Sequence, residues 1–374
     1  MIKILHVVNR LDYGGLTSFI MNYYRNMDCE KIQFDFLYID IADTRLIKEI
    51  NDLGGMCYRL PPISHLFSFI KETKFFFSNN ASHYIALHCH ALFGVALFGG
   101  IAKRYGVKRI IAHSHGIGYG DSGVFRRLRN RFFVNWAKNK SDIHIACSTE
   151  AADFMFGKND KSVLILHNAI DVAKFKFSNK ARMDIRTKLN LERVFVIGNV
   201  GNVEFVKNQS FLIDILSKMS TSGYKIVLLI VGNINVNNDN TYSSLVEKIE
   251  IEHLENSVIF TGQVNNVAAY LSAMDCFVFP SLHEGYGISL VEAQASGLVC
   301  LVSDTVPKET KILKTLEFIS LKSGTDIWTE KIMNASSSSH SQMISRDVNE
   351  TDFKNYDIKH EVKKLESLYL GFIE

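Results

Sequence analysis

Short apolar runs alternate with longer amphipathic segments along the first half of the chain. Each run is bounded by turn residues, which is the pattern of strands in a parallel sheet with a helix after each strand. The runs are IKILHVV (2–8), FDFLYI (34–39), YIALHCH (84–90), RIIAHSH (109–115), IHIACS (143–148) and VLILHN (163–168). They predict an α/β lobe built on a parallel sheet.

The same alternation starts again in the second half. Helical-period stretches such as NQSFLIDILSKM and TYSSLVEKIEIE separate the apolar runs of this part. These runs are VFVIGNVG (194–201), KIVLLIVG (225–232), VIFTG (258–262), CFVFPS (276–281) and VCLVSD (299–304). A restarted pattern predicts a second parallel-sheet lobe rather than one larger sheet.

A polar segment rich in Lys and Arg, residues 172–193, separates the two sets and shows no strand pattern, so it predicts a linker. The expected domains are therefore a first lobe at 1–171 and a second lobe at 194–355. A helical spacing of apolar residues in 356–374 predicts a last helix that packs back on the first lobe. We expect the ligand between the lobes, beside residues that directly follow strands.

Composition restricts the class of protein. The chain has 374 residues, 47% of them apolar and 22% charged, which suits two soluble globular domains. A formal net charge of +3 does not predict a nucleic-acid-binding protein. The six cysteines are widely spaced and form no C-x-x-C, so they are interpreted as reduced core thiols.

Neither a signal peptide nor a membrane span is expected. The N-terminal sequence MIKILHVVNRLDYGG has a short apolar run and no small-residue cleavage site. No stretch approaches the ~20 apolar residues that cross a bilayer. These features predict a cytoplasmic protein.

The segment Asp275–Ser296, DCFVFPSLHEGYGISLVEAQAS, holds the main candidate chemistry. It predicts a buried strand, a loop in which Glu284 is followed by two glycines, and a helix that carries Glu292. A helix start offers free N–H groups and a positive dipole end that suit a phosphate, and Gly285 and Gly287 let the backbone approach a ligand. Two carboxylates beside a phosphate site can accept hydrogen bonds from hydroxyl groups, as a sugar nucleotide requires. For an isolated pair of this spacing, solvated glutamates are the plainer interpretation.

This segment resembles the E-x₇-E region of the family-4 glycosyltransferases of the GT-B fold, through the strand and the AQASG that follows. The resemblance extends to Gly14-Gly15 after the first strand, HSHG (113–116), IACSTEAADFMFG (145–157), LHNAIDVAKF (166–175), KNQSFL (207–212) and the closing YDI…LESLY helix. It is strongest to the capsular and exopolysaccharide transferases. It implies two Rossmann-like lobes facing across a cleft, with an acceptor-side lobe at 1–171 and a donor-binding lobe at 194–355.

The resemblance also implies roles for individual residues. Glu284 is expected to contact the donor sugar, Glu292 the ribose and Lys207 the diphosphate, while the backbone of Gly285, Tyr286 and Gly287 approaches the sugar and phosphate. A fixed cation and helix N–H groups can stabilise a departing nucleoside diphosphate, so no metal cofactor is expected. Gly14-Gly15 can approach donor phosphate or acceptor, although a glycine pair is also an ordinary βα turn. This pair is not a G-x-G-x-x-G dinucleotide fingerprint.

One position departs from the family pattern. Family members carry an Arg beside the phosphate just after the glycine of the strand, and this chain has Asn202 in NVGNVEFVKN. Either Lys207 and the helix terminus suffice, or activity is weak or the donor is unusual.

Histidines stand at the ends of two predicted strands. His115 matches the family's active-site histidine and is expected to hydrogen-bond the donor sugar; the alternative is a structural histidine. His88, His90, His113 and His115 form two H-x-H pairs, which raise the question of zinc. No Cys or carboxylate stands at ligand spacing on the same strand face, so no metal site is predicted.

The segment FRRLRNRFFVNWAKNK (125–140) combines Arg126, Arg127, Arg129 and Arg131 with Phe132, Phe133 and Trp136. A basic amphipathic helix of this kind can touch anionic lipid or a lipid-diphosphate acceptor at the inner face of the membrane. The alternative is a helix whose apolar residues face the core.

The sequence thus predicts a retaining hexosyltransferase that moves a sugar from a nucleotide, with uridine diphosphate preferred, to a lipid-linked or oligosaccharide acceptor in surface polysaccharide biosynthesis. Two alternatives stay open. One is a sugar-nucleotide epimerase with the same two-lobed fold. The other is a non-catalytic sugar-nucleotide-binding partner, which Asn202 alone favours.

Overall fold

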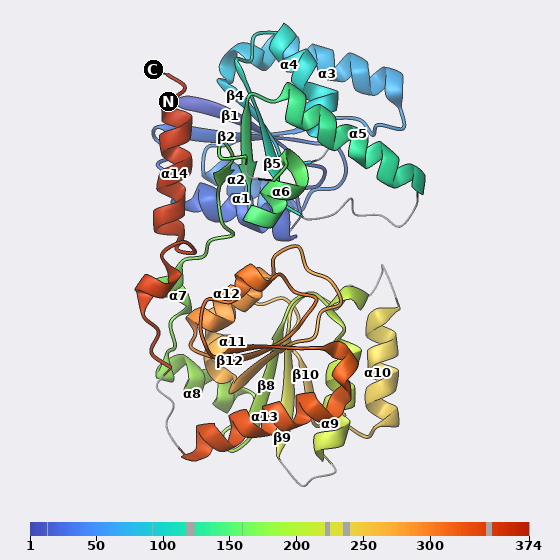
Figure 1. The fold of residues 1–374 in the computed structure, drawn as a ribbon, viewed down its shortest axis with the longest axis vertical. Helices are drawn as coiled ribbons and strands as arrows, with labels where there is room; N and C mark the ends of the chain where they lie inside the picture. The colour runs from blue at the N-terminus through green and yellow to red at the C-terminus, as the bar shows by residue number, and fades with distance from the viewer. Residues whose placement is uncertain are drawn as a thin grey trace. The chain divides into compact units, whose positions relative to one another are not determined.

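The computed structural model describes residues 1–12, 14–91, 93–116, 124–158, 160–220, 225–234, 240–341 and 346–373, without the side chains of 124–127 and 337–341. The chain divides into two compact units. Met1–Ala169 and Asn355–Glu374 form the first unit, and Ile170–Lys354 form the second. Each unit is a parallel sheet covered by helices on both faces (Figure 1).

The first unit contains a seven-stranded sheet of order β3-β2-β1-β4-β5-β6-β7. All neighbouring strands are parallel, and Ile4 of β1 lies opposite Phe34 of β2 and Ala86 of β4. The strands are β1 (Ile2–Val7), β2 (Ile32–Tyr38), β3 (Cys57–Arg59), β4 (Ala86–Cys89), β5 (Arg109–Ser114), β6 (Ile143–Ala146) and β7 (Leu164–Ile165).

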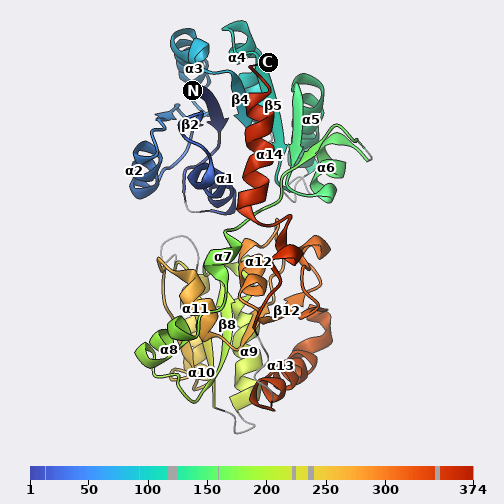
Figure 2. The ribbon, with the colours of Figure 1, turned by 90° about the vertical axis from the view of Figure 1, so that its left-hand side faces the viewer.

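Two hydrophobic layers sandwich this sheet. One holds side chains from α1 (Gly15–Asn26) and α14 (Ile358–Leu370), and it includes Tyr24 and Tyr369, which are fully buried. The other holds side chains from α3 (Leu66–Asn80), the π-helical turn η2 (Val95–Gly99), α4 (Gly100–Arg104), α5 (Val124–Lys140) and α6 (Thr149–Phe156). The last helix of the chain, α14, therefore packs on the first unit, along the same sheet face as α1 (Figure 2).

The second unit contains a six-stranded parallel sheet of order β10-β9-β8-β11-β12-β13. Its strands are β8 (Phe195–Val200), β9 (Ile226–Val231), β10 (Val258–Phe260), β11 (Cys276–Phe279), β12 (Val299–Ser303) and β13 (Leu316–Ile319). Its helices are α7 (Val172–Phe175), α8 (Asn179–Lys188), α9 (Gln209–Ser220), α10 (Thr241–Ile251), α11 (Val267–Ala273), α12 (Ile288–Ala295) and α13 (Gly324–Ser341). Trp328 of α13 is fully buried in the core that α9 and α10 share with the sheet.

The two-sheet α/β fold confirms the predicted fold class. The prediction of a linker at 172–193 is wrong, because this segment folds as α7 and α8 within the second unit. Its Arg182 and Arg186 donate hydrogen bonds to carbonyl groups near β11, so the basic residues anchor a helix to the unit. The cysteines at 29, 57, 89, 147, 276 and 300 form no disulfide, and the last four are buried.

The described helices include none with both the length and the apolar character that a bilayer crossing requires.

Candidate functional site

The order of strands in the second unit marks where a ligand can bind. From β8 the chain winds outward to β9 and β10, and from β11 it winds in the other direction to β12 and β13. Open parallel sheets bind ligands beyond the carboxyl ends of the strands at such a reversal. The loops at 201–208, after β8, and 280–287, after β11, lie there.

Hydrogen bonds join these two loops. The backbone N–H of Leu282 donates to the carbonyl of Val206 at 2.8 Å. Asn208, which has a left-handed φ of 54°, donates through Nδ2 to the carbonyl of Pro280 at 3.1 Å. These hydrogen bonds fix the two loops, and therefore their side chains, relative to each other.

Lys207 and Glu284 meet between the two loops. Lys207 Nζ lies 2.7 Å from Glu284 Oε1, with side-chain exposures of 20% and 8%. The same Nζ lies 5.4 Å from the ring centroid of Phe279, at the end of β11. The structure thus brings together a cation and a carboxylate that are far apart in the sequence, in surroundings largely shielded from water.

The loop that carries Glu284 leads directly into α12. Gly287 precedes this helix with a φ of 82°, a left-handed conformation that favours glycine, and no side chain caps the helix start. An uncapped start presents N–H groups and the positive end of the helix dipole to a ligand. Gly285 is exposed, whereas Tyr286 is buried beneath the loop.

Glu292 lies in the second turn of α12 and is half-buried. Burial raises the pKa of its carboxyl to about 7, and the charge of Lys174 opposes this shift. Lys174 belongs to α7, which packs against α12. The two predicted glutamates therefore have different surroundings, because Glu284 has an ion-pair partner at hydrogen-bond distance and Glu292 is mainly desolvated.

Asn202 lies in the loop after β8, as the sequence predicts. Its Nδ2 donates to Glu204 Oε1 at 3.2 Å, and its carbonyl accepts from Gln209 Nε2 at 2.9 Å. The backbone here passes very close to the next strand's loop, since a Cβ at Gly232 would lie 2.0 Å from the carbonyl oxygen of Gly201. Because Asn202 is uncharged, Lys207 is the cation that the loop at 201–208 contributes.

The other predicted site residues belong to the first unit. Gly14 precedes α1 in an extended conformation that any residue can adopt, and a Cβ at Gly15 would meet no atom within 4 Å. Open space above Gly15 permits a ligand to approach. The backbone conformation at Gly14 and Gly15 does not itself require glycine. His115 directly follows β5 and is half-buried.

His115 belongs to a cluster of five histidines on one face of the first sheet. The others are His6 in β1, His88 in β4, His90 directly after β4, and His113 in β5. His90 lies 2.8 Å from His6 and 2.9 Å from His115, and His88 lies 3.1 Å from His113, between ring nitrogens. Burial lowers the pKa of all five, to about 3 for His6 and His115.

Two triads in this cluster, His6–His88–His90 and His90–His113–His115, place nitrogen atoms within 4.8 Å of one another, close enough to share a metal ion. However, several rings stack nearly parallel, such as His113 and His115 at 4.0 Å and 29°. Stacked rings present their nitrogens side by side rather than converging on one point. The prediction that no metal is needed stays a prediction.

His88, His90, His113 and His115 stand out in the sequence as two H-x-H pairs, whereas His6 does not. His6 stands inside an ordinary apolar run, IKILHVV. Its contact with His90 requires that β1 pair with β4, which are separated by two strands in the sequence. The alternation of side chains along each strand predicts which face of the sheet a histidine occupies. Only the order of strands in the sheet shows that the five histidines are neighbours.

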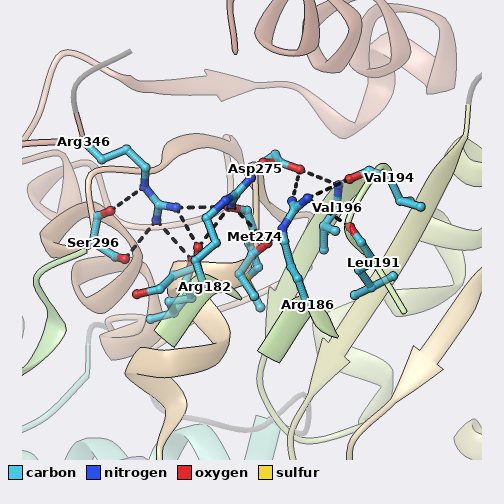
Figure 3. Close-up of polar contacts among 12 residues, drawn as sticks. Arg182, Arg186, Leu191, Val194, Val196, Met274, Asp275, Ser296 and Arg346 are labelled. Atoms are coloured by element: carbon cyan, nitrogen blue, oxygen red, sulfur yellow. Dashed lines mark hydrogen bonds and ion pairs between the residues drawn. The ribbon is translucent and has the colours of Figure 1, made fainter. Parts of the chain in front are cut away.

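A separate polar cluster lies at the opposite end of β11 (Figure 3). Asp275, directly before β11, forms ion pairs with Arg182 at 2.5 Å and with Arg186, and it accepts the N–H of Val196 at 2.8 Å. Arg346 donates nearby to the carbonyl groups of Ser272, Met274, Leu271 and Ser296. These groups pair with one another at the amino end of the sheet, so we interpret the cluster as structural.

The protein has two Rossmann-like parallel-sheet units. In the second unit, a cation, a carboxylate and an uncapped helix start lie where the order of strands reverses. This architecture is that of the GT-B class of fold. Residues 181–339 match the model of a family described as Glycosyl transferases group 1.

Similar proteins agree with this class. The chain is 28% identical over 342 residues to the proposed glycosyltransferase EpsF of Bacillus subtilis (strain 168), covering 89% of this chain and 87% of that protein. It is 23% identical to the UDP-Gal:alpha-D-GlcNAc-diphosphoundecaprenol alpha-1,3-galactosyltransferase of Escherichia coli, over 100% of this chain and 97% of that protein. Its fold resembles the crystal structure of Anabaena Alr3699/HepE in complex with UDP and glucose, with a TM-score of 0.81, 16% identity and 99% of each chain covered. Together with the family-model match, these similarities support a GT-B glycosyltransferase.

Proposed function

We propose that this protein is a retaining glycosyltransferase that moves a hexosyl group from a uridine diphosphate sugar to a lipid-linked or oligosaccharide acceptor in surface polysaccharide biosynthesis. The observation that carries the proposal is the Lys207–Glu284 pair, 2.7 Å apart, beside the uncapped start of α12. A cation and free N–H groups suit a diphosphate, and a carboxylate at the same place suits sugar hydroxyl groups.

The proposed reaction breaks the bond between the anomeric carbon and the diphosphate oxygen. The acceptor oxygen bonds to the same face of that carbon, and its proton passes to the leaving phosphate. Lys207 and the N–H groups of α12 stabilise the charge that develops on this phosphate, so the reaction needs no metal. Glu284 orients the sugar and Glu292 the ribose, while His115 hydrogen-bonds the sugar.

The similar proteins support the choice of donor and acceptor. The Escherichia coli relative is named for UDP-Gal and for a diphosphoundecaprenol acceptor. A further relative, 23% identical over 99% of both chains, is the Staphylococcus aureus capsular polysaccharide biosynthesis glycosyltransferase CapH. The Escherichia coli name fits a site that holds a diphosphate and a sugar, and the Staphylococcus aureus name fits a role in surface polysaccharide biosynthesis.

We further propose that α5 brings the protein to the inner face of the membrane, where a lipid-linked acceptor lies. Leu128, Phe132 and Trp136 are 59%, 54% and 39% exposed and recur every fourth residue, so they share one helix face. Arg129 and Arg131 beside them are exposed. Arg126 and Arg127 lie outside the described side chains. Exposure of Phe132 and Trp136 is what membrane contact requires and what core packing would not produce.

A panel of nucleotide sugars tests the transferase proposal. The purified protein is mixed with each one, and thermal stabilisation and release of nucleoside diphosphate are measured with and without a membrane extract. We expect one uridine diphosphate sugar to stabilise the protein and to be consumed only with extract, and we expect a chelator to leave the rate unchanged.

Other outcomes favour the alternatives. Stabilisation without consumption would indicate a non-catalytic binding partner, for which Asn202 in place of an Arg is the favouring observation. Conversion of the donor into a second sugar nucleotide without any acceptor would indicate an epimerase.

A further inference from the structure

Three histidines form a hydrogen-bonded row that ends at the proposed sugar contact. His6 Nδ1 lies 2.8 Å from His90 Nε2, and His90 Nδ1 lies 2.9 Å from His115 Nε2. His90 thus uses both of its ring nitrogens within the row. Nδ1 of His115 is the outer end, and no residue in the described part of the chain forms a hydrogen bond with it.

Other rings fix the orientation of His115. His113 stacks on it with centroids 4.0 Å apart, and Phe19 of α1 meets it edge-on at 5.0 Å and 71°. Together with the bond to His90, these contacts restrain the imidazole on three sides. The direction in which Nδ1 points is therefore set by the fold rather than by a ligand.

When the three rings are neutral, all hydrogen bonds of the row must point the same way. Burial lowers the pKa of His6, His90 and His115 far enough that each is neutral near pH 7. A neutral imidazole carries one N–H and one bare nitrogen. Each ring can therefore donate on one side and accept on the other, so the position of one proton determines the positions of all three.

Surroundings at the inner end select the direction. Nε2 of His6 is buried without a hydrogen-bond partner, and the rings of Phe34 and Phe36 lie 4.0 Å and 5.6 Å from the His6 ring. A buried N–H without an acceptor is rarer than a buried acceptor without a donor. Nε2 of His6 is then the bare nitrogen, its Nδ1–H donates to His90, and the Nδ1–H of His90 donates to His115.

We propose that His90 is a positioning residue that fixes His115 as the tautomer with its N–H on Nδ1, so that His115 donates a hydrogen bond to an oxygen of the bound sugar nucleotide and does not act as a base. The role of the bond rests on the proposed function, but the tautomer does not. A second row, in which Tyr369 of α14 bonds to His88 at 2.6 Å and His88 to His113, has no hydrogen bond to His115 and provides a matched control.

Nitrogen-15 NMR of the protein with labelled histidine tests the tautomer directly. The His115 signals are assigned by their loss in His115→Asn. We expect a protonated Nδ1 and a bare Nε2 for His115 in the unmodified protein and in Tyr369→Phe. Protonation of His115 at Nε2, or shifts of metal-bound nitrogen at His90 or His115, would overturn the proposal.

Substitutions of His90 test its positioning role. His90→Leu removes the donor, and we expect His115 to become a mixture of both tautomers. His90→Asn keeps an amide N–H near the position of Nδ1, and we expect it to preserve the single tautomer. Loss of the single tautomer in Tyr369→Phe as well would show that general loosening of the layer, not His90, is responsible.

Transfer kinetics with the donor from the nucleotide-sugar panel give the functional readout. We expect His90→Leu to lower kcat roughly tenfold or more with little change in KM, and His90→Asn to restore most of it. Equal rates in His90→Leu and the unmodified protein would overturn the role of His90. If no donor is consumed, the proposed function fails while the NMR result still decides the tautomer.

Discussion

Glu284 and Glu292 are eight positions apart, and their surroundings suit them to different tasks. Glu284 is 8% exposed and lies 2.7 Å from the Lys207 ammonium group, so the pair is already assembled without a ligand. Glu292 is mainly desolvated, and its carboxyl has a pKa raised to about 7. One carboxylate is thus organised around a cation, and the other carries a cost of burial that a ligand's hydroxyl groups can offset.

Removing either member of the Lys207–Glu284 pair should abolish most of the transfer activity. We expect Lys207→Ala and Glu284→Ala each to lower kcat/KM by about two orders of magnitude or more, because each loses a group that stabilises the transition state. Lys331→Ala is the control, since Lys331 pairs with Glu317 away from the loops after β8 and β11. Near-normal kcat/KM in both site variants would refute the assignment.

Glu292 should make stability depend on pH. Its folded pKa of about 7 lies above the ordinary value of 4.5, so the protonated form is favoured by folding and stability falls as pH rises from about 4.5 to 7. Glu292→Gln removes this loss. We expect the ligand-free variant to melt at a higher temperature than the unmodified protein at pH 8, and by a smaller margin at pH 5. Added donor should raise the melting temperature of the variant less than that of the unmodified protein.

Calorimetry at both pH values, with and without the donor, measures these effects. An equal margin at pH 5 and pH 8 would mean that Glu292 keeps an ordinary pKa. Unchanged stabilisation by the donor would mean that Glu292 does not contact it.

The sequence predicts some of these residues and not their relationships. Glu284, Glu292 and Lys207 follow from strand–loop–helix patterning and from resemblance to a family. The hydrogen bonds between the loops that hold Lys207 against Glu284 require the pairing of β8 with β11, which no local pattern contains. The row through His6 escapes prediction for the same reason, because β1 and β4 pair across the sheet.

At the scale of elements, α5 is the feature that the proposed reaction does not explain. Its buried side, with Val134 and Ala137, packs into the first unit, and its opposite side exposes Leu128, Phe132 and Trp136. On α3, which covers the same sheet face, Phe67 and Phe75 are 93% and 66% exposed. Exposed aromatic residues beside arginines are typical of a surface that enters the headgroup region of a membrane.

Membrane contact through α5 should need both its apolar and its basic residues. We expect the protein to float with vesicles that contain phosphatidylglycerol and less with pure phosphatidylcholine. Phe132→Ser with Trp136→Ser should reduce binding about tenfold or more, because apolar area that enters the membrane is lost. Arg129→Glu with Arg131→Glu should reduce it about thirtyfold or more, since each basic residue near an anionic surface contributes about 1 kcal/mol and about 1.4 kcal/mol is a factor of ten. Ile251→Ser, which changes an exposed apolar residue of the second unit, is the control. Unchanged flotation of both double variants would contradict the proposal.

Most elements follow from periodicity, and the exceptions have physical causes. The strands β3 and β13 were not predicted, because CYR and LEFI are short and lack a long apolar run. Residues 172–193 resemble a linker because their charged side chains hide a helical pattern. Arg186 of α8 is in fact buried and bonds to the carbonyl groups of Ala273, Leu191 and Val194, which a composition-based interpretation cannot anticipate.

At the scale of the whole molecule, each unit has its own cores and one tryptophan. The chain builds the first unit to Ala169, completes the second at Lys354, and returns to the first with α14. The two tryptophans of the sequence are Trp136, on α5 of the first unit, and Trp328, fully buried in the second. A Trp136→Phe background therefore gives a fluorescence signal from the second unit alone.

This signal can test whether the Asp275 cluster holds the second unit together. Asp275 joins α8 to the starts of β8 and β11 through Arg182, Arg186 and the N–H of Val196. Asp275→Asn leaves two partly buried guanidinium groups without their carboxylate, and we expect it to lower the free energy of unfolding by roughly 3 kcal/mol. In urea titrations followed by Trp328 fluorescence, the midpoint should fall accordingly.

Asp326→Asn is the matched control, because Asp326 also pairs with a cation, Lys218, but its side chain is 75% exposed. Exposed pairs contribute little to stability, so its midpoint should stay close to that of the Trp136→Phe background. A shift in Asp275→Asn no larger than that in Asp326→Asn would show that α8 is held by its apolar contacts. The basic segment 172–193 would then be closer to the linker that its composition predicts, because its arginines would contribute little to the second unit.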